Sequence, residues 1–249
     1  YRCDKRPNGQ GVKFTDVSKE SGIYQAAMGY GLGISVADFN NDGWDDLYVS
    51  NDFHEDDYYY LNQRNGTFKE VVKEHFKHLS RFSMGSDATD VNNDGYPDLI
   101  TLDMYPEDES VEKLSTGEDS FDTYLYKLQF GYFNQYSRNC LQINVGGEQF
   151  MEVAAQAGVV ATDWSWSPLL ADFDNDGVKD LFVSNGIVRR PNDLEYIKYI
   201  ANDSLHYAAD VSKQLDQQAF DKMPEGTWHN YVYKGTRESK LGISFEDKS

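Results

Sequence analysis

The sequence is poor in cysteine and in basic residues, and it has no long apolar run. Two cysteines, Cys3 and Cys140, are too few for a disulfide framework or a cysteine-ligated zinc site, so they leave the redox compartment open. The chain has 23 basic against 42 acidic residues, and a net charge of −19 argues against nucleic-acid partners because it repels phosphate. No stretch approaches the roughly 20 apolar residues of a membrane helix, so we expect no membrane span in this segment.

The apolar and aromatic content is nevertheless high enough for a folded core. At 249 residues, the chain has the length of one large domain or two small ones. Hydrophobic residues make up 39% and aromatic residues 14%, which is too rich for a disordered chain. We therefore expect an ordered chain despite its acidity.

One nine-residue acidic string occurs three times, over 38–46, 90–98 and 172–180. Each copy follows the pattern D-x-[DN]-N-D-G-x-x-D and continues into a short apolar run typical of a strand. Five fixed polar or glycine positions that recur three times in one chain do not arise by chance. The chain is therefore predicted to be built from repeated units.

A weaker repeat of hairpins lies between the acidic strings. Asn65-Gly66 joins two short strand-like segments, Gly146-Gly147 joins another pair, and half-preserved copies lie over 1–17 and 231–247. One unit then reads as strand, acidic loop, strand, connection, strand, tight turn and strand. Four short strands in about 50 residues predict a propeller blade.

Two long segments interrupt this pattern, over 104–138 and 186–230. Each is predicted to lie in the connection between the second and third strands of its unit, so both should emerge on the same face. Residues 193–200 and 204–220 of the second insertion have helical composition. The first insertion contains eight aromatic residues, from which we expect an interaction patch. They are Tyr105, Phe121, Tyr124, Tyr126, Phe130, Tyr132, Phe133 and Tyr136.

The acidic strings offer oxygen ligands in the arrangement that Ca²⁺ prefers. Positions one, three, five and nine would supply side-chain oxygens, position seven its carbonyl, and glycine at position six allows the sharp turn. An EF-hand also needs a bidentate Glu at position twelve, where this chain has Val49, Thr101 and Val183. A metal-free Asx-rich turn would hold three or four carboxylates together without a counter-ion, and Mg²⁺ rarely accepts an all-protein cage.

We therefore predict three calcium ions, one in each loop. The carbonyls of Trp44, Tyr96 and Val178 would complete the sites. The predicted side-chain ligands are Asp38, Asn40, Asp42 and Asp46 in the first loop, Asp90, Asn92, Asp94 and Asp98 in the second, and Asp172, Asp174, Asp176 and Asp180 in the third.

Together with the run 31–37, the acidic loops resemble FG-GAP repeats, also called VCBS repeats, which are the calcium-binding blades of integrin-α-type β-propellers. The phrases at 83–87, 162–167 and 184–187 resemble large bacterial FG-GAP/VCBS surface proteins that often carry an ASPIC/UnbV domain. The resemblance implies that residues 1–249 form an all-β propeller segment of about three and a half four-stranded blades with two partly helical insertions. Since closed propellers have about four to eight blades, we expect flanking sequence or another chain to complete the ring.

The same resemblance implies a function. It indicates a calcium-stabilised extracellular or cell-surface module that binds or scaffolds proteins or glycans within a larger complex. The implied location is extracellular or the bacterial outer-membrane surface, with a lipid anchor before residue 1 as one option. A carbohydrate-active lyase or hydrolase and a purely structural spacer are the alternatives. We expect no enzyme, because the chain has no Gly-x-Ser-x-Gly elbow, HExxH helix or CxxC pair.

Two further motifs have ordinary explanations. The glycine run 29–33 precedes a strand-like segment, whereas a phosphate loop would precede a helix, so we predict close contact near the propeller axis. His75 and His78 are three residues apart, but lysines and a glutamate surround them. We predict a solvated surface there and no zinc site.

Two aromatic segments are open to a binding interpretation. The run Glu55–Tyr60 is predicted to be a connection that enters a strand, with a sugar or cation site as the less favoured interpretation. Trp164 and Trp166 alternate at the period of a strand, so we predict that they belong to the core and do not form a ligand platform.

Overall fold

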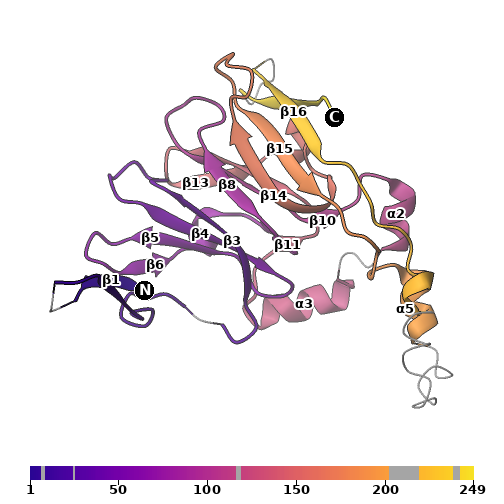
Figure 1. Cartoon of the computed structure of the whole chain (residues 1–249), viewed down its shortest axis with the longest axis horizontal. Coiled ribbons are helices and arrows are strands. Elements are labelled where there is room, and N and C mark those ends of the chain that lie inside the picture. The colour runs from indigo at the N-terminus through magenta and orange to yellow at the C-terminus, as the bar shows by residue number, and fades with distance from the viewer. Residues whose placement is uncertain (7–8, 25, 116–118, 202–218, 238–241) are drawn as a thin grey trace.

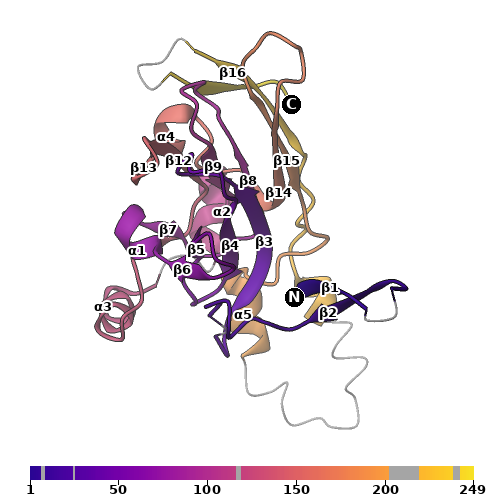
Figure 2. The ribbon, with the colours of Figure 1, turned by 90° about the vertical axis from the view of Figure 1, so that its left-hand side faces the viewer.

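A computed structural model describes residues 1–6, 9–24, 26–115, 119–201, 219–237 and 242–249. Residues 116–118 of the first insertion and 202–218 of the second lie outside these ranges, so the predicted helix over 204–220 falls almost wholly outside them. The described residues are mainly strands, and the sheets curl into a half-barrel (Figure 1 and Figure 2). The fold is the predicted all-β, propeller-like arrangement with helical insertions.

Three antiparallel sheets follow one another along the chain, and each begins with its innermost strand. The first contains β3 (Tyr30–Ala37), β4 (Asp46–Asp52), β5 (Tyr58–Asn62) and β6 (Phe68–Glu70). The second contains β8 (Ser86–Thr89), β9 (Asp98–Thr101), β12 (Cys140–Val145) and β13 (Gln149–Glu152). The third contains β14 (Asp163–Ala171), β15 (Asp180–Asn185), β16 (Tyr231–Thr236) and β17 (Ser244–Asp247), with β10 (Met104–Tyr105) added beside β14.

The remaining elements are short. A separate hairpin pairs β1 (Arg2–Lys5) with β2 (Val12–Thr15), and β7 (Leu79–Ser80) pairs in parallel with β11 (Gln135–Tyr136). The hairpin is the half unit that the sequence predicts at the start of the chain. The segment over 231–247 forms the hairpin predicted there, since β16 pairs with β17, and its pairing with β15 completes the third sheet. The helices are α1 (Val72–His75), α2 (Glu109–Leu114), α3 (Phe121–Gln129), α4 (Ala154–Ala157) and α5 (Leu194–Ile200).

Two apolar clusters lie between neighbouring sheets. One joins the first and second sheets through stacked and edge-on rings, including Phe76 and Phe150 with centroids 4.3 Å apart. The other joins the second and third sheets through aliphatic residues such as Leu141 and Leu181. Face-to-face contact of successive sheets buries the apolar side of each strand, as propeller blades do. Of the two cysteines, Cys3 is exposed, Cys140 is buried, and they form no disulfide.

Glycine allows the inner strands to approach one another closely. A Cβ at Gly33 would lie 3.0 Å from the carbonyl oxygen of Met84, and one at Gly85 would lie 2.4 Å from that of Trp166. These glycines therefore set the separation of β3, β8 and β14. Close contact at Gly33 agrees with the prediction made from the glycine run.

Substitution Gly85→Ala should lower the free energy of unfolding by about 1–3 kcal/mol, because the new methyl group cannot fit without a backbone shift. Gly31→Ala is the matched control, since its Cβ would meet nothing closer than Val49 Cγ1 at 3.4 Å. Denaturant titration of both variants measures the difference. Equal losses would contradict a steric role for Gly85.

A buried carboxyl group joins the first two sheets. Asp57 accepts hydrogen bonds from the Tyr48 hydroxyl at 2.6 Å, the Ser83 hydroxyl at 2.7 Å and the backbone N–H of Asn51 at 2.7 Å. Complete burial raises the pKa of Asp57 to about 7, although these donors oppose the shift. The pKa of an aspartate in the unfolded chain is about 4. Between this pH and about 7, the folded protein therefore binds one more proton than the unfolded chain.

Stability should therefore fall as the pH rises from about 4 to about 7, by up to about 1.4 kcal/mol per pH unit from this group. Asp57→Asn, which keeps the shape and has no charge to bury, should flatten that slope. Unfolding is measured across this pH range with saturating calcium, so that the loop carboxylates stay ionised. A slope that survives the substitution would show that another group causes it.

Candidate metal centres

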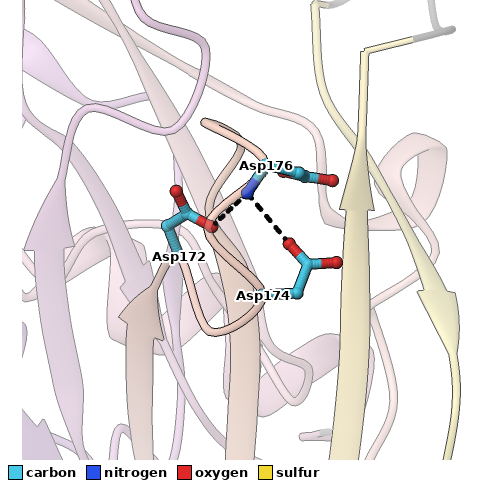
Figure 3. A group of neighbouring side chains, drawn as sticks. All are labelled: Asp172, Asp174 and Asp176. Atoms are coloured by element: carbon cyan, nitrogen blue, oxygen red, sulfur yellow. Dashed lines mark hydrogen bonds between the residues drawn. The ribbon is translucent and has the colours of Figure 1, made fainter.

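Each acidic loop joins the first and second strands of its sheet and is shaped by hydrogen bonds to its own carboxylates. In the third loop, the backbone N–H of Asp176 donates to Asp172 Oδ1 at 3.0 Å and to Asp174 Oδ1 at 3.2 Å (Figure 3). The N–H of Gly177 donates to Asp172 Oδ2 at 2.9 Å. The corresponding bonds recur in the first and second loops. The three loops therefore share one geometry.

The fixed asparagine and glycine of the repeat have backbone conformations that explain their presence. Asn41, Asn93 and Asn175 have φ angles of 55°, 59° and 61°, in the left-handed region that asparagine tolerates. The glycine two positions later also has positive φ in every loop. These two positions turn the chain tightly enough for the acidic side chains to converge.

The fourth-position asparagines also connect successive loops. Asn41 donates to the carbonyl of Gly95 at 2.8 Å, and Asn93 donates to the carbonyl of Gly177 at 3.1 Å. All three loops therefore lie side by side at one edge of the sheets. The repeat pattern does not predict these two hydrogen bonds, because each of them joins loops of different sheets.

The third loop brings three carboxylates within metal-binding distance. One oxygen from each of Asp172, Asp174 and Asp176 lies within 4.8 Å of the others, the single such group of His, Cys, Asp and Glu among the described residues. Lys234 of β16 donates to Asp174 and, at 2.9 Å, to Asp176, and these bonds raise the pKa of Lys234. The loops at 38–46 and 90–98 have asparagine at the third position and so hold fewer carboxylates.

The ninth-position aspartates are anchored by the protein itself. Asp46 is fully buried and accepts the N–H of Phe39 at 3.3 Å and of Asn62 at 2.8 Å, and Asp98 and Asp180 make the equivalent pairs of bonds. Burial, with the nearby negative charges, raises the pKa of Asp46 to about 6 and that of Asp98 to about 7. These residues therefore fasten each loop to its third strand, a role that the sequence did not reveal.

The donor set fits a hard divalent cation. Each loop presents only oxygen ligands, and a carboxylate with two hydrogen bonds still has free lone pairs for a metal. A cation would also offset the nearby negative charges that, after burial, raise the pKa values of Asp46 and Asp98. Basic side chains neutralise part of the negative charge of the loops. Arg64 contacts Asp42 at 2.8 Å, and Lys234 contacts the third loop.

The other motifs lie as follows. The run Glu55–Tyr60 leads into β5 as predicted, although Glu55 and Tyr58 also line a pocket of about 480 Å³.

The prediction of solvated histidines is wrong. His78 is half-buried with Nε2 3.4 Å from Glu152 Oε2, and His75 contacts the Tyr59 ring. Neither histidine belongs to a metal-capable group in the described part of the chain.

The core assignment of the two tryptophans is also wrong. On β14 the serine and aspartate side of the strand is buried, whereas Trp164 is half-buried and Trp166 is 47% exposed. The alternating pattern indicates a strand but does not show which side faces the core. Both tryptophans line a pocket together with residues of the two insertions.

The insertions lie next to each other. An isolated antiparallel bridge pairs Ser115 of the first with Asp193 of the second, near α2 and α5 (Figure 1). Within the first insertion, Phe121, Tyr126 and Phe130 are 72%, 62% and 81% exposed. The eight aromatic residues of the first insertion are therefore not all buried against the blades.

Comparison with known protein families gives one match. Residues 38–101, which include the first two acidic loops, match the model of the FG-GAP-like repeat. A search of curated proteins finds no match to the chain. None of the described helices has the length and apolar character needed to cross a membrane.

Proposed function

We propose that this chain, an FG-GAP repeat protein, is a calcium-stabilised binding or scaffold module that holds protein or glycan partners at an extracellular or bacterial cell surface. The repeat itself indicates a propeller-type binding or scaffold module. The observation that carries the calcium proposal is the shared geometry of three oxygen-lined loops at one edge of the sheets.

Calcium is favoured over other ions by the chemistry of the loops. The ligands are carboxylates, amide oxygens and carbonyls, without sulfur or imidazole, which suits a hard cation with a flexible coordination shell. Extracellular calcium modules typically bind with dissociation constants of about 10⁻⁴–10⁻³ M, and such weak sites are filled only where calcium is abundant. The proposed extracellular location would supply calcium at the concentration that sites of this affinity need.

The ions would have a structural role. Each loop connects the innermost strand of a sheet to the next strand, and the asparagine bridges join one loop to the next. Bound calcium would therefore fix the edge of all three sheets together. The side chains that would hold the ions are those of Asp38, Asn40, Asp42, Asp46, Asp90, Asn92, Asp94, Asp98, Asp172, Asp174, Asp176 and Asp180.

Partner binding is assigned to the face that carries the insertions. The rings of Phe121, Tyr126 and Phe130 are large apolar groups that lie exposed on and just after α3 of the first insertion. Exposed aromatic residues of this kind are enriched in interface hot spots.

The test is binding of the calcium-loaded chain to glycan and peptide arrays. The triple variant Phe121→Ser, Tyr126→Ser and Phe130→Ser should lose most of the binding, whereas Phe14→Ser on β2, which is 63% exposed, should keep it. Chelation should also weaken binding. Array signals that are unchanged in the triple variant and in chelator would contradict the proposal.

A further inference from the structure

A pocket of about 720 Å³ lies where the inner strands meet the two insertions. β3 contributes Leu32, the turn after β4 contributes Phe53, β14 contributes Trp164 and Trp166, and α5 of the second insertion contributes Ile197. Its volume is that of a small-molecule site, and its lining is mainly apolar and aromatic.

The lining holds five aromatic rings. The rings of Phe53 and Phe82 meet edge to face with centroids 6.0 Å apart, and Tyr105, Trp164 and Trp166 complete the set. Phe53 has a φ of 68°, which is rare for an aromatic residue. Such an unfavourable conformation persists only where the surroundings enforce it, and it is often found at ligand sites.

The charges in this pocket are all negative. Asp52 and Glu112 line it, and none of the described lining residues is basic. The Arg81 guanidinium lies 4.6 Å from the centroid of the Phe82 ring but is paired with Asp119 at 2.7 Å, and Arg190, next to the lining residue Pro191, is paired with Asp163 at 2.9 Å.

The two acids differ in their surroundings. Glu112 accepts a hydrogen bond from the Tyr105 hydroxyl at 3.0 Å, and Asp52 accepts one from the N–H of Phe53 at 2.8 Å. Burial raises the pKa of Asp52. Neither carboxylate has an ion-pair partner within the part of the chain that the structure describes, so a cation in the pocket would be their first counter-charge.

Two buried polar atoms at the wall also have no partner. Trp164 Nε1 and Asn192 Oδ1 make no hydrogen bond among the described residues. A buried donor and acceptor without partners are costly, and a ligand with a hydroxyl or carbonyl group could satisfy them.

We propose that this pocket binds a substituted ammonium group, carried either by a small molecule or by the side chain of a methylated lysine in a partner. Aromatic rings attract such a cation through their electron-rich faces, and Asp52 and Glu112 supply the opposite charge. The net charge of −19 favours the approach of cations. The inference rests on the proposed binding function and names the chemistry that one part of the insertion face recognises.

The test uses choline and its uncharged isostere, in which carbon replaces the ammonium nitrogen. Binding to the full calcium-loaded chain is measured by calorimetry and by quenching of tryptophan fluorescence. Choline should bind saturably and at least about tenfold more tightly than the isostere, as expected for a cation held by rings and carboxylates. A peptide with trimethyl-lysine, compared with the same peptide carrying an acetylated lysine, identifies whether the group comes from a protein.

Variants separate the two contributions. Asp52→Asn and Trp166→Ala should each weaken choline binding about tenfold, whereas Asp122→Asn on α3 and Phe14→Ala on β2 should leave it unchanged. Thermal melting of each variant, with and without calcium, shows that the fold is intact. Equal binding of choline and the isostere, or full binding by Asp52→Asn and Trp166→Ala, would overturn the proposal. Failure of choline to bind a chain that calcium still stabilises would reject the pocket assignment alone.

Discussion

Chelation of calcium should lower the melting temperature of the chain by roughly 15 °C or more. A site held at a hundredfold excess over its dissociation constant contributes about 2.7 kcal/mol, so the three loops together contribute up to about 8 kcal/mol. In a chain of this size, each kcal/mol corresponds to about 2–4 °C. Differential scanning calorimetry measures the shift between excess chelator and about 10–100 mM calcium, which is a hundredfold above dissociation constants of about 10⁻⁴–10⁻³ M.

The size of the effect follows from the position of the loops. Without a cation, Asp172, Asp174 and Asp176 repel one another, and Lys234, with a smaller contribution from Arg237, offsets part of their charge. The buried Asp46 and Asp98 add the cost of neighbouring negative charge in a poorly solvated site. A bound Ca²⁺ removes both costs in the folded state and has no equivalent site in the unfolded chain.

The chain contains its own controls for this prediction. Asp174→Asn gives the third loop the asparagine that Asn40 and Asn92 already provide in the other loops, so most of the calcium effect should remain. Asp176→Ala removes a ligand that every loop has, so about a third of the calcium-dependent shift should disappear. Identical melting curves in calcium and in chelator would refute calcium stabilisation, and equal stabilisation by magnesium would refute the choice of ion.

The sequence could predict the fold and the loops because both depend on local rules. A glycine and an asparagine that must adopt positive φ recur at fixed positions, and the apolar runs that follow are short enough to be strands. Because each unit is formed by residues close in sequence, the spacing of the acidic loops along the chain also predicts the order of the blades. In the three large sheets, with β10 excepted, the strands pair in chain order as a meander.

What the sequence did not predict depends on contacts between distant residues. The burial of Ser165 in place of Trp166 depends on which side of β14 faces the second sheet, and a period of two cannot distinguish the sides. The pairing of β15 with β16 spans the whole second insertion. Likewise, the third-strand donor to Asp180 is the N–H of Gly235, far along the chain.

Breaking the buried ion pair between Arg190 and Asp163 should have the second large effect. Arg190 Nη2 lies 2.9 Å from both carboxylate oxygens of Asp163, and their side chains are only 7% and 0% exposed. Arg190→Met leaves the Asp163 carboxylate buried without a counter-charge, which typically costs about 3–5 kcal/mol. The pair also anchors the second insertion to the start of β14, so the loss should include local ordering of that insertion.

The double variant Arg190→Met with Asp163→Asn should recover part of the stability, because it removes the uncompensated charge. The exposed pair Lys198–Glu195, at 71% and 68% exposure, is the matched control, and Lys198→Met should change the free energy of unfolding by less than about 0.5 kcal/mol. Urea denaturation in calcium compares the three variants. Because Asp163 precedes Trp164 and Arg190 precedes Pro191 and Asn192, Arg190→Met should also weaken choline binding in the pocket that these residues line. A loss as small as that of the exposed pair would show that the buried ion pair does not hold the insertion in place.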